Sequence, residues 1–220
     1  MSNQTTPQGP HQGQQILTDG KPLAETDAAM ILIHGRGASA YDIMELGFLL
    51  GGDQFALLAP QAANNTWYPF SFLAPLANNE PYLSSALQAL ADLVAQVEAA
   101  GSPASRIILA GFSQGACLAS EFAARNARRY GGLLLFSGGL IGPPGTPRDY
   151  PGTLDGTPVF IGCSDIDAHI PLSRVQETTK ILTTLGAQVN EKIYPNMPHT
   201  IIQDELDQAQ KITEQLASDG

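Results

Sequence analysis

The sequence predicts an α/β fold built as one domain, with a mostly parallel central sheet and helices on both of its faces. Short apolar runs alternate with helical patterns along nearly the whole chain, which is the arrangement of β-α-β units. The apolar runs lack polar alternation, as expected of strands buried on both faces of a parallel sheet. The length of 220 residues suits a single core of this kind.

The expected elements follow one another in a regular order. Continuous apolar runs define the strands, and apolar spacing or runs of small residues define the helices. In chain order they are a strand at 28–33, a helix at 41–50, a strand at 55–59, a helix at 80–100, a strand at 106–110, a helix at 116–124, strands at 132–136 and 159–162, a helix at 171–185, a strand at 189–194 and a helix at 199–217.

Local signals support individual elements. Pro60 stops the second strand, because proline cannot donate to a sheet ladder. The helix at 80–100 is the clearest, because its apolar residues recur at three- and four-residue spacings and Gly101 closes it. Pro171 suits the first turn of the helix that it begins.

Two long stretches have no regular pattern. The aromatic loop, residues 61–79, takes its name from Trp67, Tyr68, Phe70 and Phe72. These side chains argue against disorder. The proline-rich loop, residues 138–156, is dense in glycine and proline. Because a long irregular stretch in a compact domain is usually functional or disordered, we expect the two loops to shape access to a site.

Charge and hydropathy exclude several kinds of partner. The net charge is −10, which argues against nucleic acid and against electrostatic binding to anionic membranes. No apolar run reaches the length of a membrane span. We therefore expect a small-molecule substrate and no stable membrane association.

The amino-terminal residues are polar and lack the apolar core of a signal peptide. We expect residues 1–13 to form a flexible polar tail and residues 14–220 to form the folded domain. Cys117 and Cys163 fall in a predicted buried helix and at a predicted strand end. The sequence thus favours two unpaired thiols in a reducing cytoplasm over a disulfide.

The stretch Gly111-Phe112-Ser113-Gln114-Gly115 carries the strongest chemical signal. It has the form G-x-S-x-G and lies between a predicted strand and a predicted helix. A serine on so sharp a turn projects its hydroxyl from the sheet edge, and the flanking glycines avoid a clash. Because a serine hydroxyl is a poor nucleophile at neutral pH, it needs a base and a third group that orients the base.

Histidine is the expected base, and the chain has four. His11 falls in the polar tail, His34 directly follows the first predicted strand and is expected to shape a turn, and His169 lies beside the candidate acids. His199 follows the last predicted strand and is the expected base. The order serine, acid, histidine is that of the α/β-hydrolases.

Two aspartates could orient His199. Asp165 and Asp167 both follow a predicted strand, and the aspartate that does not hold the histidine would serve as a turn former or helix cap. The oxyanion of the transition state needs backbone donors. One is expected from Gln114, the residue after the serine, and the other from the His34–Gly37 loop.

Four stretches resemble the phospholipase/carboxylesterase branch of the α/β-hydrolase superfamily, which includes acyl-protein thioesterases and small bacterial carboxylesterases. They occur in the family's order over most of the chain: Ile33 to Gly37, Gly111 to Gly115, Asp167 to Pro171 and Pro198 to Thr200. The resemblance implies a single-domain α/β-hydrolase fold. Because the expected helices and strands already use up the chain, we expect no separate lid domain. The resemblance also implies a monomer or a homodimer.

The resemblance assigns individual roles. It implies a triad of Ser113, Asp167 and His199, with Asp167 chosen over Asp165, and it places the oxyanion donors at Arg36 and Gln114. The chain departs from the family's usual Asp-Pro-x-Val-Pro stretch, because Ala168 and His169 occupy its middle. Such a triad needs no cofactor and no metal, and the sequence shows no cluster with metal-ligand spacing.

The two loops supply the expected pocket residues. An apolar wall is expected from Trp67, Tyr68, Phe70, Phe72 and Leu73, which could instead form a small core beneath the loop. Leu140 and Ile141 are expected on the opposite side.

The sequence thus predicts a cytoplasmic serine carboxylesterase that hydrolyses small, fairly apolar esters through an acyl-enzyme on Ser113. The alternatives are a thioesterase or lysophospholipase-type acyl hydrolase and, in a different class, a non-catalytic protein that binds a small apolar ligand. Coenzyme A esters are less favoured because Arg36 and Arg148 are the only basic side chains expected near the pocket.

Overall fold

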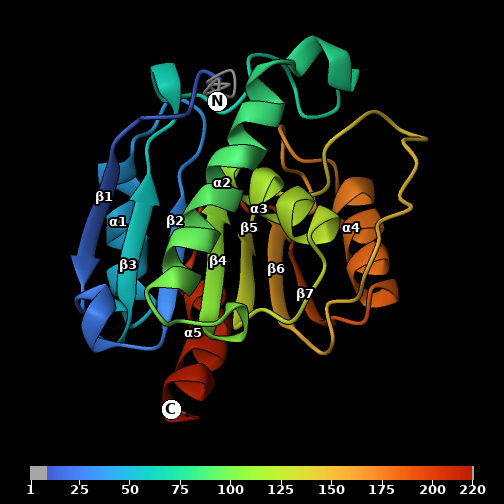
Figure 1. Cartoon of the computed structure of the whole chain (residues 1–220). Helices are drawn as coiled ribbons and strands as arrows, with labels where there is room; N and C mark the ends of the chain where they lie inside the picture. Colours follow the sequence, from blue (N-terminus) through green and yellow to red (C-terminus); the bar gives the residue numbers. More distant parts are fainter. Residues whose placement is uncertain (1–8, 220) are drawn as a thin grey trace, which may run out of the picture.

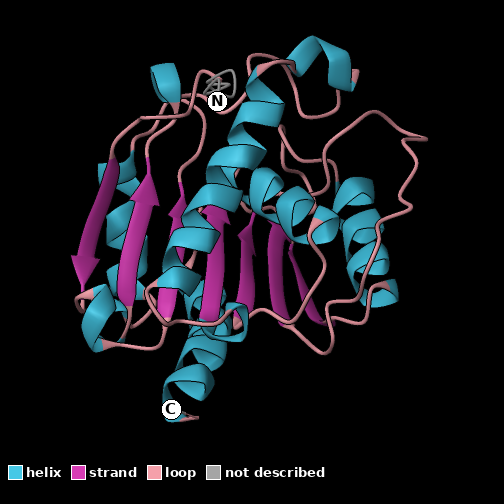
Figure 2. Ribbon diagram, viewed as in Figure 1, coloured by secondary structure: helices cyan, strands magenta, loops and turns pink. Residues whose placement is uncertain are grey.

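The computed structural model describes residues 9–219 and has three layers, shown in Figure 1 and, by secondary structure, in Figure 2. A seven-stranded sheet, in the order β1-β3-β2-β4-β5-β6-β7, lies between two layers of helices. Helices α1 and α5 pack on one face of the sheet, and α2, α3 and α4 pack on the other. This architecture confirms the predicted α/β class.

The elements have the following bounds. The strands are β1 (Ile16–Gly20), β2 (Ala29–Ile33), β3 (Ala56–Pro60), β4 (Ile107–Phe112), β5 (Gly132–Phe136), β6 (Pro158–Ser164) and β7 (Gln188–Tyr194). The helices are α1 (Ala40–Leu49), α2 (Tyr82–Ala99), α3 (Gln114–Arg125), α4 (Leu172–Thr184) and α5 (Gln203–Ser218).

The central strands are buried on both faces, which explains their continuous apolar runs. In β2, Ala29, Ile31 and Ile33 belong to the core beneath α2, α3 and α4. The alternate residues Met30 and Leu32 belong to the core beneath α1 and α5. Since successive side chains of a strand point to opposite faces, a strand between two helical layers must be apolar throughout.

Strands β2 to β7 are parallel, so their carboxyl ends meet at one edge of the sheet, at the top of Figure 1. In open α/β sheets this edge is where ligands bind. The aromatic loop lies at this edge, whereas the proline-rich loop runs from this edge down the α4 side of the molecule to the start of β6. In the part of the chain that the structure describes, loops and not an inserted domain surround it.

The amino-terminal part differs from the sequence prediction. Residues 16–20 form β1, an edge strand that pairs antiparallel with β3 and was not predicted, because its mostly exposed sequence has no apolar run. Residues 1–8 of the expected tail lie outside the described residues. Residues 9–13 are not a flexible tail, because His11 is buried and its ring bonds to the aromatic loop.

Two element boundaries bear on the site. Strand β4 runs to Phe112, into the G-x-S-x-G stretch. Helix α5 begins at Gln203, so His199 lies on a loop rather than at the predicted helix start. Among the helices of residues 9–219, none combines the length and the apolar character needed to cross a bilayer.

Candidate active site

Ser113 occupies a sharp turn between a strand and a helix. It lies between the end of β4 and the start of α3, with φ of 56° and ψ of −118°. A positive φ in a residue with a side chain is uncommon and strained. Gly115 permits the turn, because a Cβ atom there would overlap the carbonyl oxygen of Ile33. The backbone thus holds the Ser113 side chain at the carboxyl edge of the sheet.

His199 connects Ser113 to Asp167. Its Nε2 lies 2.9 Å from Ser113 Oγ, and its Nδ1 lies 2.6 Å from Asp167 Oδ2. The Asp167 side chain is fully buried, whereas that of His199 is 20% exposed. The three residues come from the turn after β4, the loop after β6 and the loop after β7, so parallel strand ends bring together positions that are far apart in the sequence.

The environment of Asp167 favours its charged form. Burial by itself would raise the pKa of this carboxyl. Hydrogen bonds from His199 and from the backbone N–H groups of His169 and Ile170 outweigh burial and hold the pKa below its ordinary value. Asp167 is therefore an anion that can orient His199 and stabilise its protonated ring.

Asp165, the other candidate acid, has a different position. Its Oδ1 accepts a hydrogen bond of 2.8 Å from the backbone N–H of Asn196. This bond ties the loop after β6 to the loop that bears His199. The structure thus brings Asp167 to the histidine and gives Asp165 a supporting contact, as expected of an aspartate that shapes a turn.

The other histidines lie around the same centre. The ring of His169 meets that of His199 edge to face, with centroids 4.8 Å apart. His34 is buried and its Nε2 accepts from the backbone N–H of Ala62, so it shapes a loop as predicted. Burial lowers the pKa of His11 and of His34, which keeps both rings neutral near pH 7.

The expected oxyanion donors lie next to Ser113. Gln114 is the first residue of α3, so its N–H is one of the donors that a helix start leaves unpaired. Arg36 lies in the turn closed by a hydrogen bond from Ala38 to Gly35. Within residues 9–219, the backbone N–H of Arg36 has no acceptor.

The side chains of Arg36 and Gln114 both bond to the backbone of the aromatic loop, which the sequence did not predict. Arg36 donates to the carbonyl oxygens of Pro69 and Phe70, at 2.8 and 2.6 Å. Gln114 accepts from the N–H of Trp67 and donates to the carbonyl of Tyr68, both at 2.9 Å. The residues expected to bind the oxyanion thus also hold the aromatic loop from two sides.

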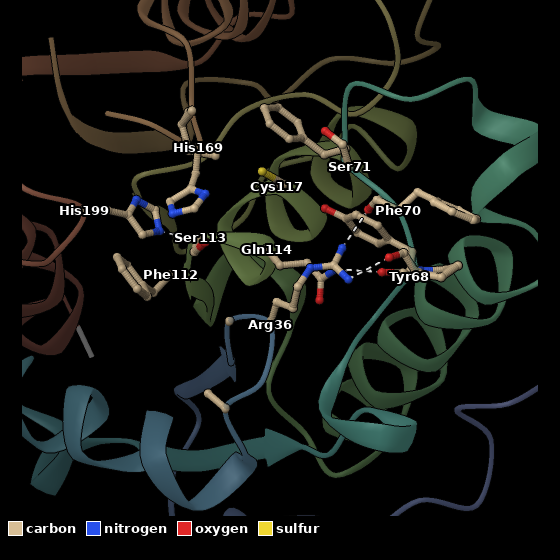
Figure 3. Close-up of a pocket in the computed structure, with 15 residues that line it drawn as sticks. Arg36, Tyr68, Phe70, Ser71, Phe112, Ser113, Gln114, Cys117, His169 and His199 are labelled. Carbon is tan, nitrogen blue, oxygen red and sulfur yellow. Dashed lines mark hydrogen bonds between the residues drawn. The ribbon is translucent and has the colours of Figure 1, made fainter. Parts of the chain in front are cut away.

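A pocket of about 600 Å³ opens at Ser113, a size ordinary for a small-molecule site. Figure 3 shows His199 and Phe112 at one end and Tyr68 and Phe70 at the other. Of the predicted wall, Tyr68, Phe70 and Phe72 line the pocket. His169, which was not predicted to line it, does so too.

The remaining predicted pocket residues lie elsewhere. Trp67 is fully buried, and its indole N–H donates to the carbonyl of His34 at 2.9 Å. Leu140 and Ile141 are also fully buried in the core between the sheet and its helices, and Leu73 is not part of the pocket wall. For Trp67 and Leu73 the alternative of a core beneath the loop describes the structure, whereas the expectation that Leu140 and Ile141 line the pocket is wrong.

Cys117 lines the pocket one helical turn after Ser113. Its side chain is buried, and burial raises the pKa of the thiol to about 12. A thiol with such a pKa is protonated near pH 7 and is a poor nucleophile. Ser113 is therefore the better candidate for the attacking group.

Comparisons with known proteins identify the family of the chain. A family model described as Phospholipase/Carboxylesterase matches residues 20–217. Acyl-protein thioesterase 1 of Eremothecium gossypii is 29% identical over 203 residues, which are 82% of this chain and 84% of that protein. Acyl-protein thioesterase 1 of Gibberella zeae is 30% identical over 122 residues, which span 54% of this chain and only about half, 52%, of that relative.

A solved structure is similar over almost its whole length. The crystal structure of a phospholipase/carboxylesterase from Dyadobacter fermentans superposes with a TM-score of 0.89 and 47% identity, covering 91% of this chain and 97% of that one. The family match spans far more than half of the chain. The chain therefore belongs to the phospholipase/carboxylesterase family of ester hydrolases, with the α/β-hydrolase fold.

Proposed function

We propose that the protein is a serine carboxylesterase that hydrolyses small, fairly apolar esters through an acyl-enzyme on Ser113. The observation that carries the proposal is the unbroken hydrogen-bonded chain from Ser113 through His199 to Asp167. The arrangement matches the requirement for a nucleophile, a base and a group that orients the base.

In the proposed first step, Ser113 Oγ attacks the ester carbonyl while its proton moves to His199 Nε2. The carbonyl electron pair moves to oxygen, where the N–H groups of Arg36 and Gln114 stabilise the negative charge. The carbon–oxygen bond to the alcohol then breaks, and the leaving oxygen takes the proton from His199. Water, activated by the same histidine, cleaves the acyl-enzyme and restores Ser113.

The pocket supports a modest, largely apolar substrate. Tyr68, Phe70 and Phe72 supply aromatic surface, and the guanidinium of Arg36 is engaged by loop carbonyls. Arg148, the other basic side chain considered for coenzyme A, is turned to Glu177 and has only 8% of its side chain exposed. Neither arginine is free to bind a polyphosphate at the pocket mouth.

The proposal is tested with p-nitrophenyl butyrate and two variants. Ser113→Ala should lower kcat/KM by at least about 1000-fold, whereas Cys117→Ser should retain activity within about tenfold. An active Ser113→Ala protein would overturn the proposal. Absence of turnover and of labelling by a fluorophosphonate would favour a non-catalytic binding protein.

The named relatives favour a second candidate, a thioesterase. Both are called acyl-protein thioesterases, and the proposed acyl-enzyme chemistry cleaves a thioester equally well. Comparing kcat/KM for an oxygen ester and a thioester with the same acyl group distinguishes the two. A ratio of more than about tenfold in favour of the thioester would replace carboxylesterase by thioesterase.

A further inference from the structure

A second hollow, here called the α1 groove, adjoins the candidate active site. It has a volume of about 370 Å³ and lies between α1, the loop after β7 and the start of α5. It shares four residues with the Ser113 pocket, namely Gly35, Ala38, Phe112 and His199. The Phe112 and His199 rings, whose centroids lie 4.9 Å apart, therefore line both hollows, which are neighbours.

The two hollows differ in which reacting groups they contain. The Ser113 pocket includes Ser113 and both expected oxyanion residues, Arg36 and Gln114. The α1 groove includes His199 but none of these three. An ester carbonyl held at Ser113 and the oxyanion donors would thus place its acyl carbon chain in the Ser113 pocket.

The proton that His199 donates in the proposed mechanism determines where the alcohol part of the ester must lie. When the tetrahedral intermediate collapses, the electron pair of the breaking carbon–oxygen bond goes to the alcohol oxygen, which takes the proton from His199 Nε2. The leaving oxygen must therefore lie against the histidine. Both hollows include His199, and the α1 groove is the one of the two whose lining lacks Ser113, Arg36 and Gln114.

The lining of the groove indicates which alcohols fit. The apolar part of its lining is formed by Ile43, Leu46, Leu49, Ile201 and Leu206. At its rim are two exposed carboxylates, Asp42 and Glu45. Hydrogen bonds from Ser39 lower the pKa of Asp42, and the lining includes no lysine or arginine. Such a groove favours apolar groups and repels anions.

We propose that the α1 groove is the alcohol subsite and takes apolar alcohol groups that carry no negative charge. The inference rests on the proposed esterase function and adds to it the side on which each half of the ester lies. It makes two predictions, one about the length of the alcohol and one about its charge.

The first experiment varies the alcohol at constant acyl group. Acid release from methyl, ethyl and n-butyl acetate gives kcat/KM for each. Burying a methylene is worth up to about fourfold in binding, so n-butyl acetate should exceed methyl acetate by up to about 50-fold. Leu49→Gln should lower this ratio at least about threefold. Phe48→Gln is the matched control, because Phe48 is exposed on the same helix but does not line the groove.

The second experiment varies charge. The anionic ester 4-acetoxybutanoate should be a poorer substrate than n-butyl acetate, and Glu45→Gln should improve it about threefold, with a smaller effect at high salt. Glu214→Gln is the control, because Glu214 is exposed on α5 and outside the groove. Equal responses of the two variants would overturn the charge prediction.

Hydrolysis of methyl acetate separates the inference from the function on which it rests. If methyl acetate is hydrolysed through Ser113 but the butyl-to-methyl ratio is unchanged by Leu49→Gln, the esterase proposal stands and the subsite assignment is wrong. The assignment is also wrong if Leu49→Gln instead alters the preference between ethyl acetate and ethyl butyrate, because the groove would then hold the acyl chain. If the wild-type protein hydrolyses none of these esters through Ser113, the proposed function itself is wrong.

Discussion

The aromatic loop and the proline-rich loop are both long and lack a regular pattern in the sequence, yet the structure fixes them by different contacts. The aromatic loop is held by Arg36 and Gln114 of the candidate site, by the buried His11 and His34 rings, and by its own Asn79. It supplies the wall of the Ser113 pocket. Its position is therefore coupled to the geometry of the site.

The proline-rich loop is fixed by buried charges away from Ser113. Glu121 accepts from the N–H of Ile141 and from the Tyr150 hydroxyl, and Arg148 donates to the carbonyl of Ile141 and pairs with Glu177. Neither loop is disordered, but only the first lines the pocket. The comparison shows that an irregular stretch can be long because it builds a site or because it covers a core.

The largest expected effect is a loss of stability without a loss of activity, caused by a substitution beneath the proline-rich loop. Glu121→Ala should lower the free energy of unfolding by about 3–5 kcal/mol, because it leaves the N–H of Ile141 and the Tyr150 hydroxyl without their acceptor and removes one of the two carboxylates that face the buried Arg148. The folded fraction should keep kcat/KM within about threefold. Urea unfolding and ester turnover measure the two quantities, and a large loss of kcat/KM in folded protein would contradict the division between the loops.

Glu205 is a second buried carboxyl and, unlike Glu121, has no ion-pair partner within residues 9–219. Glu205 is fully buried, its Oε1 has no hydrogen-bond partner within residues 9–219, and burial raises its pKa to about 7. Since the folded state holds this proton more tightly than the unfolded chain, the contribution to stability is complete below about pH 4.5 and is lost as the pH rises through 7.

The corresponding variant is Glu205→Gln. Between pH 5 and pH 8 the wild-type protein should lose about 2–3 kcal/mol of unfolding free energy that the variant does not lose. Urea unfolding of both proteins at the two pH values measures the difference. Parallel pH dependences would show that Glu205 is already charged in the folded protein at low pH.

In the aromatic loop, Gln114→Ala should act mainly on catalysis. The variant keeps the backbone N–H of residue 114 but removes the bonds to Trp67 and Tyr68. We expect kcat to fall about 10- to 100-fold, since small displacements in a site have effects of this size, and stability to fall by about 1–3 kcal/mol.

Thr178→Val is the matched variant for the proline-rich loop, because Thr178 of α4 bonds to that loop as Gln114 bonds to the aromatic loop. Thr178 is buried and accepts from the N–H of Leu140 at 2.9 Å. Its loss should lower stability by a similar amount and leave kcat unchanged. If the two variants alter kcat equally, the aromatic loop has no special coupling to the site.

The smallest effect is expected from Phe70→Ala. Phe70 is 56% exposed and lines the pocket, so the variant should raise KM for an aryl or butyryl ester about two- to fivefold and change stability by less than about 0.5 kcal/mol. Leu140→Ala should do the reverse, with unchanged KM and a loss of about 2–5 kcal/mol. Steady-state kinetics and urea unfolding on both variants test the contrast.

Much of the fold could be predicted because buried strands have an unmistakable pattern. The run at residues 28–33 is apolar throughout, as a strand between two helical layers must be. The edge strand β1 gave no such signal, because its side chains are mostly exposed. His11 was assigned to a tail because its burial depends on contacts with residues 63, 67 and 85, which no local pattern records.

The candidate site also combines residues that local patterns indicate with roles that depend on distant contacts. Ser113 and His199 could be located because strand ends and the G-x-S-x-G turn are local features. The choice between Asp165 and Asp167 needed either a family resemblance or the three-dimensional contact to His199. The roles of the Arg36 and Gln114 side chains could not be predicted, because they act on backbone carbonyls more than 30 residues away.

Labelling with a fluorophosphonate tests the central claim, that Ser113 is the nucleophile activated by His199, most directly. Intact mass and peptide mapping should show one phosphonyl adduct on Ser113 in the wild-type protein, none in Ser113→Ala, and labelling slowed at least about 1000-fold in folded His199→Ala. An adduct on another residue, such as Cys117, or an equal labelling rate without His199 would contradict the claim.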